Sequence, residues 1–314
     1  MSFTAFINRI LCAIHFAFAR RRLKGKKGHE IQKVYFIINP ASGIGKHKAL
    51  LTQFKRMPCH CDSDYSERPG HAKELAAAAA SRGYDAIIAV GGDGTVNEVA
   101  TALIGSDIPL GIIPTGSGNG FARHLGISTL LPKAIATIGR GTAARVDTMR
   151  IGDIPYLSVA GIGFDASVSI AFSSEPRRGL ASYLKVVLQH LPTYKPQHYE
   201  LIVDGVPMER EAFLITFANA AQYGNNVHIA PQAEIDDGYF DLCILKRFPP
   251  QATPKLVKKL LTKKIHESEY VETARCRSVT IKGGPIECHV DGDPHRFTDD
   301  VTISIVPASL RVLR

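Results

Sequence analysis

Glycine-rich segments occur three times in the first 120 residues, each directly after an apolar run. They are Asn39–Gly43 (NPASG), Gly91–Thr95 (GGDGT) and Gly116–Gly120 (GSGNG). Because glycine has no Cβ atom, its backbone can approach a phosphate closely and donate N–H groups to the oxygens, and a following helix N-terminus adds positive potential. Together the three segments predict a binding site for a polyphosphate.

Several aspartates with a glycine beside them could take part in phosphoryl transfer. The reaction needs neutralised phosphate oxygens and an acceptor for the proton of the attacking hydroxyl. Asp93, between glycines at the end of an apolar run, is expected to hold Mg²⁺ directly or through water. Asp291 could accept the proton. Asp237-Gly238 and Asp291-Gly292 are also ordinary turn sequences, so the residues alone leave a purely structural role open for both.

The elements that must position these residues alternate along the first half of the chain. Apolar runs predict strands at Val34–Ile38, Ala86–Val90 and Pro109–Ile113, with helices over 46–56, 74–82 and 96–104. Such strand–loop–helix units are typical of a parallel sheet covered by helices, an α/β fold. The carboxyl ends of parallel strands share one edge, where ligands bind. We therefore expect the glycine-rich segments to meet there.

Beyond about Arg145, short runs of alternating polarity predict an antiparallel β domain with two helices, over 180–189 and 254–265. We interpret Gly161–Ala166 (GIGFDA) as a glycine-dense turn, because no clear βαβ unit follows it. The predicted strands are Tyr156–Ala160, His198–Val203, Ala212–Asn219, Tyr239–Leu245, Ser278–Ile281, Glu287–Val290 and Val301–Val306.

The N-terminal arm is amphipathic and basic. Apolar residues of Ser2–Arg22 fall on one helical face, and a basic run follows. This pattern predicts a helix in the headgroup layer of an anionic membrane, although a helix packed on its own domain with a basic linker is the alternative. In the helix expected over 254–265, five lysines between Lys255 and Lys264 lie on the face opposite the leucines. The default interpretation is that this basic face is solvated, and the alternative is that it docks on a membrane.

Charge and composition narrow the class of partner. The net charge of +9 indicates an anionic partner, but no recognition motif or aromatic stacking platform supports nucleic acid. No run reaches the roughly 18 apolar residues that a membrane-spanning helix needs. The six scattered cysteines indicate a reducing compartment. We expect a cytoplasmic protein that is peripherally associated with the inner face of the membrane; its oligomeric state is open, with a homodimer as one option.

The ordered motifs resemble the catalytic domain of the diacylglycerol kinase and sphingosine kinase superfamily, in particular its soluble bacterial lipid kinases. The resemblance implies an N-terminal α/β domain like that of NAD kinase and phosphofructokinase, and a C-terminal antiparallel β-sandwich. The expected boundaries are an arm over 1–30, a nucleotide-binding domain over 31–147 and 305–314, and a lipid-substrate domain over 148–304. The motifs are Asn39–Gly43, Gly91–Glu98, Pro114–Leu125, Gly161–Ala166, Asp236–Asp241 and Asp291–Asp293.

The resemblance also implies roles for individual residues. Asp291 would be the catalytic base, assisted by Asp93, and a structural Mg²⁺ would be bound by the Asp237 carboxylate and the carbonyls of Glu234 and Tyr239. The family's Asp-Gly-Glu loop reads Asp291-Gly292-Asp293 here, which leaves the role of Asp293 open. The residues implied in ATP binding are Asn39, Pro40, Ala41, Ser42, Gly43, Ser66, Gly91, Gly92, Asp93, Gly94, Thr95, Val96, Asn97, Glu98, Gly116, Ser117 and Asn119.

The resemblance predicts an ATP- and Mg²⁺-dependent kinase that phosphorylates a lipid hydroxyl, with diacylglycerol as the favoured acceptor and phosphatidic acid as the product. A sphingoid base is the first alternative, because Gly116–Asn119 resembles the sphingosine kinase form of that loop. A kinase of a soluble substrate such as NAD would explain Gly91–Gly94 but not the later motifs. A nucleotide-binding regulator without catalysis is disfavoured, since a pure binder does not need a general base.

Overall fold

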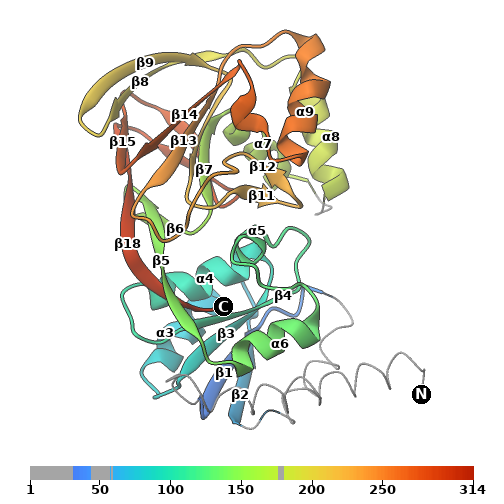
Figure 1. The fold of residues 1–314 in the computed structure, drawn as a ribbon, viewed down its shortest axis with the longest axis vertical. Helices are drawn as coiled ribbons and strands as arrows, with labels where there is room; N and C mark the ends of the chain where they lie inside the picture. The colour runs from blue at the N-terminus through green and yellow to red at the C-terminus, as the bar shows by residue number, and fades with distance from the viewer. Residues whose placement is uncertain (1–30, 44–56, 58, 176–179) are drawn as a thin grey trace. The chain divides into compact units, whose positions relative to one another are not determined.

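The computed structural model describes residues 31–43, 57, 59–175 and 180–314 (Figure 1). The chain forms two compact units. Unit 1 comprises the chain up to Val146 together with Ser309–Arg314, and unit 2 comprises Asp147–Ala308. The N-terminal arm and the helix expected over 46–56 lie outside the described residues.

Unit 1 contains the parallel sheet that the apolar runs predict. Its strands run in the order β2-β1-β3-β4-β18, and the pairs β1–β2, β1–β3, β3–β4 and β4–β18 are all parallel. The apolar strands β1 and β3 are almost completely buried, as expected where helices cover both faces of a parallel sheet. The bounds are β1 Lys33–Ile38, β2 His60–Tyr65, β3 Ala86–Gly91, β4 Leu110–Pro114 and β18 Val301–Leu313.

The helices of unit 1 bury small or aliphatic stripes. In α4 the buried residues Val96, Val99, Ala100 and Leu103 follow the helical i, i+3, i+4, i+7 spacing. This helix begins at Asp93, three residues before the expected start, so the Gly91–Thr95 segment is itself a strand–helix junction. The bounds are α3 His71–Ala80, α4 Asp93–Leu103, α5 Gly120–His124 and α6 Leu131–Gly139.

Unit 2 contains the predicted antiparallel β-sandwich. One sheet has the order β14-β13-β10-β7-β16-β17, with antiparallel pairing throughout. The other sheet includes β15, β8 and β9 beside the first part of β18. Aliphatic and aromatic residues of both sheets, such as Tyr156, Phe217 and Ile303, form the core. The strands are β5 Ala143–Ile151, β6 Ile154–Tyr156, β7 Val159–Gly163, β8 Gln197–Val203, β9 Val206–Ala212, β10 Leu214–Ala218, β11 Gln222–Gly224, β12 Val227–His228, β13 Phe240–Leu245, β14 Val271–Cys276, β15 Ser278–Ile281, β16 Ile286–Val290 and β17 Asp293–Phe297.

The GIGFDA segment is not a turn, contrary to the sequence interpretation. Its first residues, Gly161–Gly163, end strand β7, and Phe164 begins helix α7. Both neighbours of β7 are antiparallel to it, so the segment is still no dinucleotide-binding βαβ unit. The helices are α7 Phe164–Ser173, α8 Leu180–His190 and α9 Thr253–Leu261, with 3₁₀ turns at Pro250–Ala252 and Ile265–Glu267. No helix in the described part of the chain is long and apolar enough to cross a membrane.

Candidate active site

Four loops meet at the carboxyl edge of the unit 1 sheet, one after each of β1, β2, β3 and β4. Backbone hydrogen bonds connect neighbouring loops to the strand ends: Asn39 donates to Val90 O, Ser66 to Ile38 O, and Thr115 to Gly91 O, each at 2.9 Å. Sheet topology therefore brings together segments of the chain that are up to 80 residues apart, as the strand pattern predicts.

Two of these loops approach so closely that only glycine fits. A Cβ atom on Gly116 would lie 2.5 Å from Cα of Gly92 in the other loop, and within the junction of β3 and α4 a Cβ atom on Gly91 would lie 2.4 Å from the Thr95 side chain. Real Cβ atoms essentially never come this near to another heavy atom. The glycines therefore set the distance between the loops after β3 and β4.

Side chains fix the loops further. Asn39 donates from Nδ2 to Thr95 Oγ1 at 2.9 Å, and the hydroxyls of Ser42 and Thr115 lie 2.8 Å apart. Asn119 is buried in the left-handed conformation with φ of 52°, and its Nδ2 donates to Gly116 O at 2.7 Å. Asparagine tolerates this conformation better than most residues. These hydrogen bonds hold the backbone of the loops in fixed positions relative to one another.

Asp93 connects the second and third glycine-rich loops. Backbone N–H groups of Phe121, Asn119 and Gly120 donate to its carboxylate. Burial raises the pKa of Asp93 above its ordinary value, and these donors oppose the rise. The carboxylate lies at the N-terminus of α4, where the helix provides N–H donors and positive potential. An anion-binding backbone and a carboxylate oxygen that can take Mg²⁺ thus occur in one loop.

Not every residue implied in ATP binding presents its side chain at this edge. Both carboxylate oxygens of Glu98 accept hydrogen bonds from the start of α3, from Gly70 N at 2.9 Å and Ala72 N at 3.0 Å. Val96 also packs in the core, whereas Ser117 and Pro40 are exposed in the loops at this edge. Glu98 therefore holds α3 against α4, a stabilising role that its place in the motif does not reveal.

In unit 2, Asp291 is held by the backbone. Its Oδ2 accepts a hydrogen bond from Leu157 N at 2.8 Å, and its Oδ1 accepts from Ser158 N at 2.9 Å and Val159 N at 3.0 Å. The residue has φ of 48°, so the turn itself is strained for a residue other than glycine. Three N–H donors fix the orientation of this carboxylate.

Two family models match consecutive parts of this chain. Residues 33–151 match the family described as "Diacylglycerol kinase catalytic domain", and residues 158–314 match the "YegS C-terminal NAD kinase beta sandwich-like domain". The chain is 34% identical over 299 residues to a diacylglycerol kinase of Mycobacterium tuberculosis, covering 91% of this chain and 96% of that protein. The chain belongs to the diacylglycerol kinase family.

Further relatives come from other bacteria. The kinase is 34% identical over 229 residues to a diacylglycerol kinase of Bacillus subtilis, with 69% of this chain and 75% of that protein covered. It is 30% identical over 249 residues to the "Probable lipid kinase YegS" of Shigella boydii, with 77% and 82% covered. The crystal structure of a diacylglycerol kinase from Bacillus anthracis has the same fold, with a TM-score of 0.71 at 23% identity over 90% of this chain and 97% of that one.

The turn implied in structural Mg²⁺ binding does not fit a divalent cation in this kinase. The Arg275 guanidinium donates to Asp237 Oδ2, and Tyr239 N donates to Asp237 Oδ1 at 2.9 Å. A bound arginine competes directly with a metal ion for the one carboxylate of the set. Within the described ranges, no three His, Cys, Asp or Glu side chains are grouped so that they could hold a metal ion.

Two buried carboxylates of unit 2 were not found from sequence. Asp147 is 2% exposed and accepts hydrogen bonds from Gly238 N at 2.7 Å and Ala308 N at 2.6 Å. Asp165, in α7, accepts from Tyr223 Oη at 2.5 Å and Thr216 Oγ1 at 3.1 Å. Asp165 stands in the GIGFDA motif but was not singled out there, and Asp147 lies in no motif.

The close approach of the loops gives a prediction for ATP affinity. The Gly116→Ala substitution should raise the Kd for ATP by about 10²-fold, because the new methyl pushes apart two loops that we expect to converge on the phosphates. It should also lower the free energy of unfolding by about 1–3 kcal/mol through overpacking. Isothermal titration calorimetry and thermal unfolding would measure both.

Gly94→Ala is the matched control for stability, because a Cβ atom there has no heavy atom within 4 Å. We expect this variant to unfold at or slightly above the wild-type temperature, since alanine favours a helix. If Gly116→Ala bound ATP as tightly as the wild type, the proposed convergence of the loops on phosphate would be wrong.

Proposed function

We propose that this lipid kinase transfers the γ-phosphate of ATP to the hydroxyl of diacylglycerol and forms phosphatidic acid. The observation that carries the proposal is the 34% identity to a diacylglycerol kinase over 91% of the chain, which includes both units. The braced glycine loops of unit 1 and the fixed carboxylate of unit 2 are the two parts that such a transfer needs.

The role of unit 1 is to hold the phosphates of ATP. Backbone N–H groups at the start of α4 and in the loops after β1 and β4 would donate to phosphate oxygens. Mg²⁺ would arrive with the nucleotide and neutralise the developing charge, with Asp93 as its protein oxygen ligand. One carboxylate fits this use, because Mg²⁺ in nucleotide sites is bound mostly by phosphates and water.

The role of Asp291 is to take the proton. The lipid hydroxyl oxygen forms a bond to the γ-phosphorus, the bond between that phosphorus and the β–γ bridging oxygen breaks, and ADP leaves. The hydroxyl proton passes to the Asp291 carboxylate. The three backbone donors orient the carboxylate before the step.

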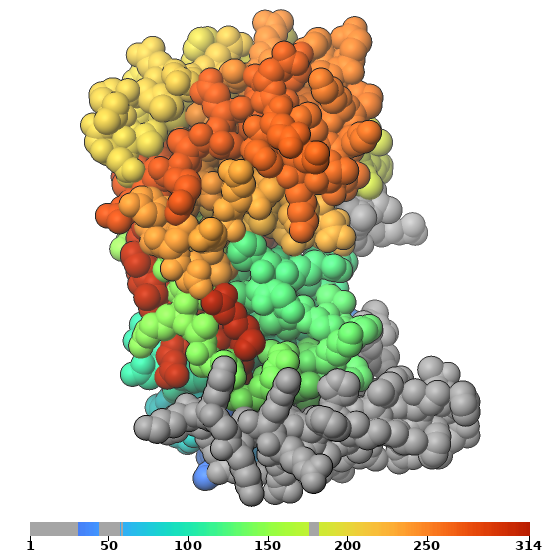
Figure 2. Space-filling model, in the orientation of Figure 1, coloured from blue at the N-terminus to red at the C-terminus, as the bar shows by residue number. Residues whose placement is uncertain are grey.

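A surface of unit 2 suits contact with the membrane that contains the acceptor. Helices α8 and α9 pack on one apolar cluster, which includes Val186 and Leu260. Helix α9 (orange) lies at the surface in Figure 2. Large apolar side chains are exposed on both helices, and basic ones on α9 accompany them. They are Leu184 at 49%, Leu188 at 68%, Val257 at 47%, Leu261 at 53%, and the exposed Lys255 and Lys258. Exposed apolar side chains can insert between lipids and lysines attract anionic headgroups, so this surface favours binding to an anionic membrane.

Transfer of radiolabelled phosphate identifies the acceptor. The kinase would be incubated with labelled ATP and Mg²⁺ in mixed micelles that contain diacylglycerol, monoacylglycerol, sphingosine or ceramide, with NAD in a parallel reaction. We expect labelled phosphatidic acid. Label on sphingosine or another lipid alone would keep the lipid kinase and replace the acceptor, whereas label on NAD alone would overturn the proposal.

A further inference from the structure

The acidic turn of unit 2 before β13 is braced by protein groups. Ile235 O accepts a hydrogen bond from Asp147 N at 2.7 Å, and Gly238 N donates to Asp147 Oδ2 at 2.7 Å. Inside the turn, Tyr239 N donates to Asp237 Oδ1 at 2.9 Å. The turn is therefore held to β5 by hydrogen bonds to Asp147, and it also contains an internal hydrogen bond of its own.

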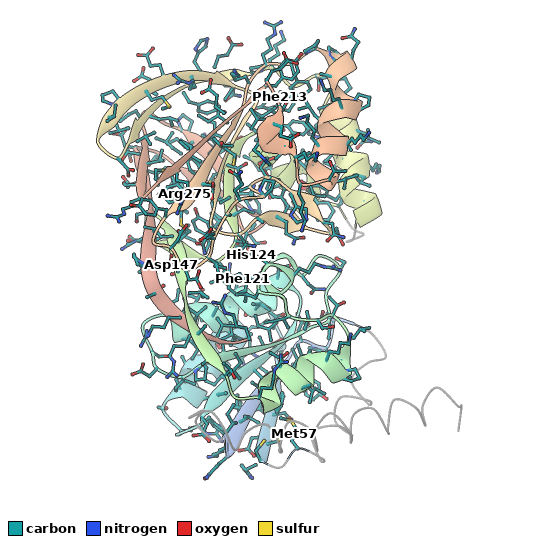
Figure 3. The ribbon with its side chains drawn as sticks, in the orientation of Figure 1. Met57, Phe121, His124, Asp147, Phe213 and Arg275 are labelled. Atoms are coloured by element: carbon teal, nitrogen blue, oxygen red, sulfur yellow. The ribbon has the colours of Figure 1, made fainter. Side chains whose placement is uncertain are left out.

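Arg275 supplies the positive charge that this turn requires. It lies in β14, where the strand register places it directly opposite Asp241 in β13. Its guanidinium donates to Asp237 Oδ2, while Cys276, the next residue along, is buried in the core. The strand pairing fixes the backbone of Arg275, which Figure 3 labels, and the guanidinium reaches Asp237 from that position in the sheet.

The surroundings of Arg275 are acidic and aromatic. Asp241 lies directly opposite Arg275 in the strand pairing, and Asp237 accepts the hydrogen bond of its guanidinium. The Arg275 guanidinium also lies 5.0 Å from the centroid of the Tyr239 ring, within the range of a cation–π contact. Carboxylates and a ring face thus contact one side of this half-exposed guanidinium.

We propose that the Arg275 guanidinium takes the place of a divalent cation at Asp237, so that this kinase holds the turn of unit 2 without a bound metal. Both oxygens of Asp237 have protein partners, one the guanidinium and the other Tyr239 N. A planar guanidinium suits a carboxylate and keeps its charge at every physiological pH. Divalent metal is then needed only with ATP.

The test measures thermal unfolding and metal binding of the full chain without nucleotide or lipid, so its outcome is separate from the acceptor assignment. Wild-type protein should unfold at the same temperature in EDTA, Mg²⁺ and Ca²⁺. Arg275→Ala should unfold earlier in EDTA and recover about 3–6 °C when excess Mg²⁺ or Ca²⁺ fills the vacated position. The double variant Arg275→Ala/Asp237→Asn should show no recovery.

Arg277→Ala is the matched control. Its guanidinium lies 4.6 Å from the same Tyr239 ring, but its substitution leaves the pair of Arg275 and Asp237 in place, so unfolding should remain independent of divalent metal. Calorimetric binding of one Mg²⁺ or Ca²⁺ to the wild type, lost in Asp237→Asn, would overturn the proposal. It would equally be overturned if Arg275→Ala gained no response to either ion.

Discussion

The Asp291→Asn substitution should lower kcat by about 10³-fold while the KM for ATP changes little. The proposed role of Asp291 is to accept the proton of the attacking hydroxyl, and an amide cannot do this. The amide keeps the size of the side chain, and its oxygen can still accept from Ser158 N and Val159 N. The loss should therefore appear in the rate of transfer and not in nucleotide binding.

Asp293→Asn is the control for this prediction. Asp293 stands two residues later, at the start of β17, and is exposed, so its substitution should change kcat only a few-fold. Stability must be measured as well, because the new amide of Asp291→Asn turns an N–H group toward Leu157 N and should cost about 1–3 kcal/mol. If Asp291→Asn kept more than a tenth of wild-type kcat while folded, Asp291 would be an anchor of the loop and not the base.

The elements of unit 1 could be predicted where burial leaves a strong apolar pattern. The wholly buried β3 was found to within one residue. Strand β2 was missed because its sequence, HCDSDY, is polar and none of its residues is buried. An edge strand of this kind forms by pairing with β1, and its own side chains carry little signal.

The sequence predicted which loops form the site, but it did not predict the long-range partners of their side chains. Glycine spacing and strand order placed Asn39, Asp93 and Gly116 at one edge. Nothing local to Glu98 shows that it caps α3, because its partners lie 26 and 28 residues earlier in the chain. Arg275 likewise reaches Asp237 across 38 residues, through a register that only the folded sheet defines.

The Asp147→Ala substitution should have the largest effect on stability, lowering the free energy of unfolding by about 3–5 kcal/mol. The carboxylate is buried, and it accepts hydrogen bonds from Gly238 N, 91 residues later, and from Ala308 N, 161 residues later. Alanine would leave both N–H groups without this acceptor. Ala308 has φ of 49°, a conformation that costs a residue other than glycine energy and that this hydrogen bond helps to hold.

Thermal unfolding separates this role from a general effect of lost charge. Asp153→Ala removes a fully exposed carboxylate of the same unit and should change the unfolding temperature little. Asp147→Asn keeps one acceptor oxygen and should lie between the wild type and Asp147→Ala. At about 2–4 °C per kcal/mol, Asp147→Ala should unfold roughly 10 °C earlier than the wild type. An unchanged unfolding temperature would show that water or a shifted backbone satisfies both N–H groups, and that the turn before β13 does not depend on Asp147.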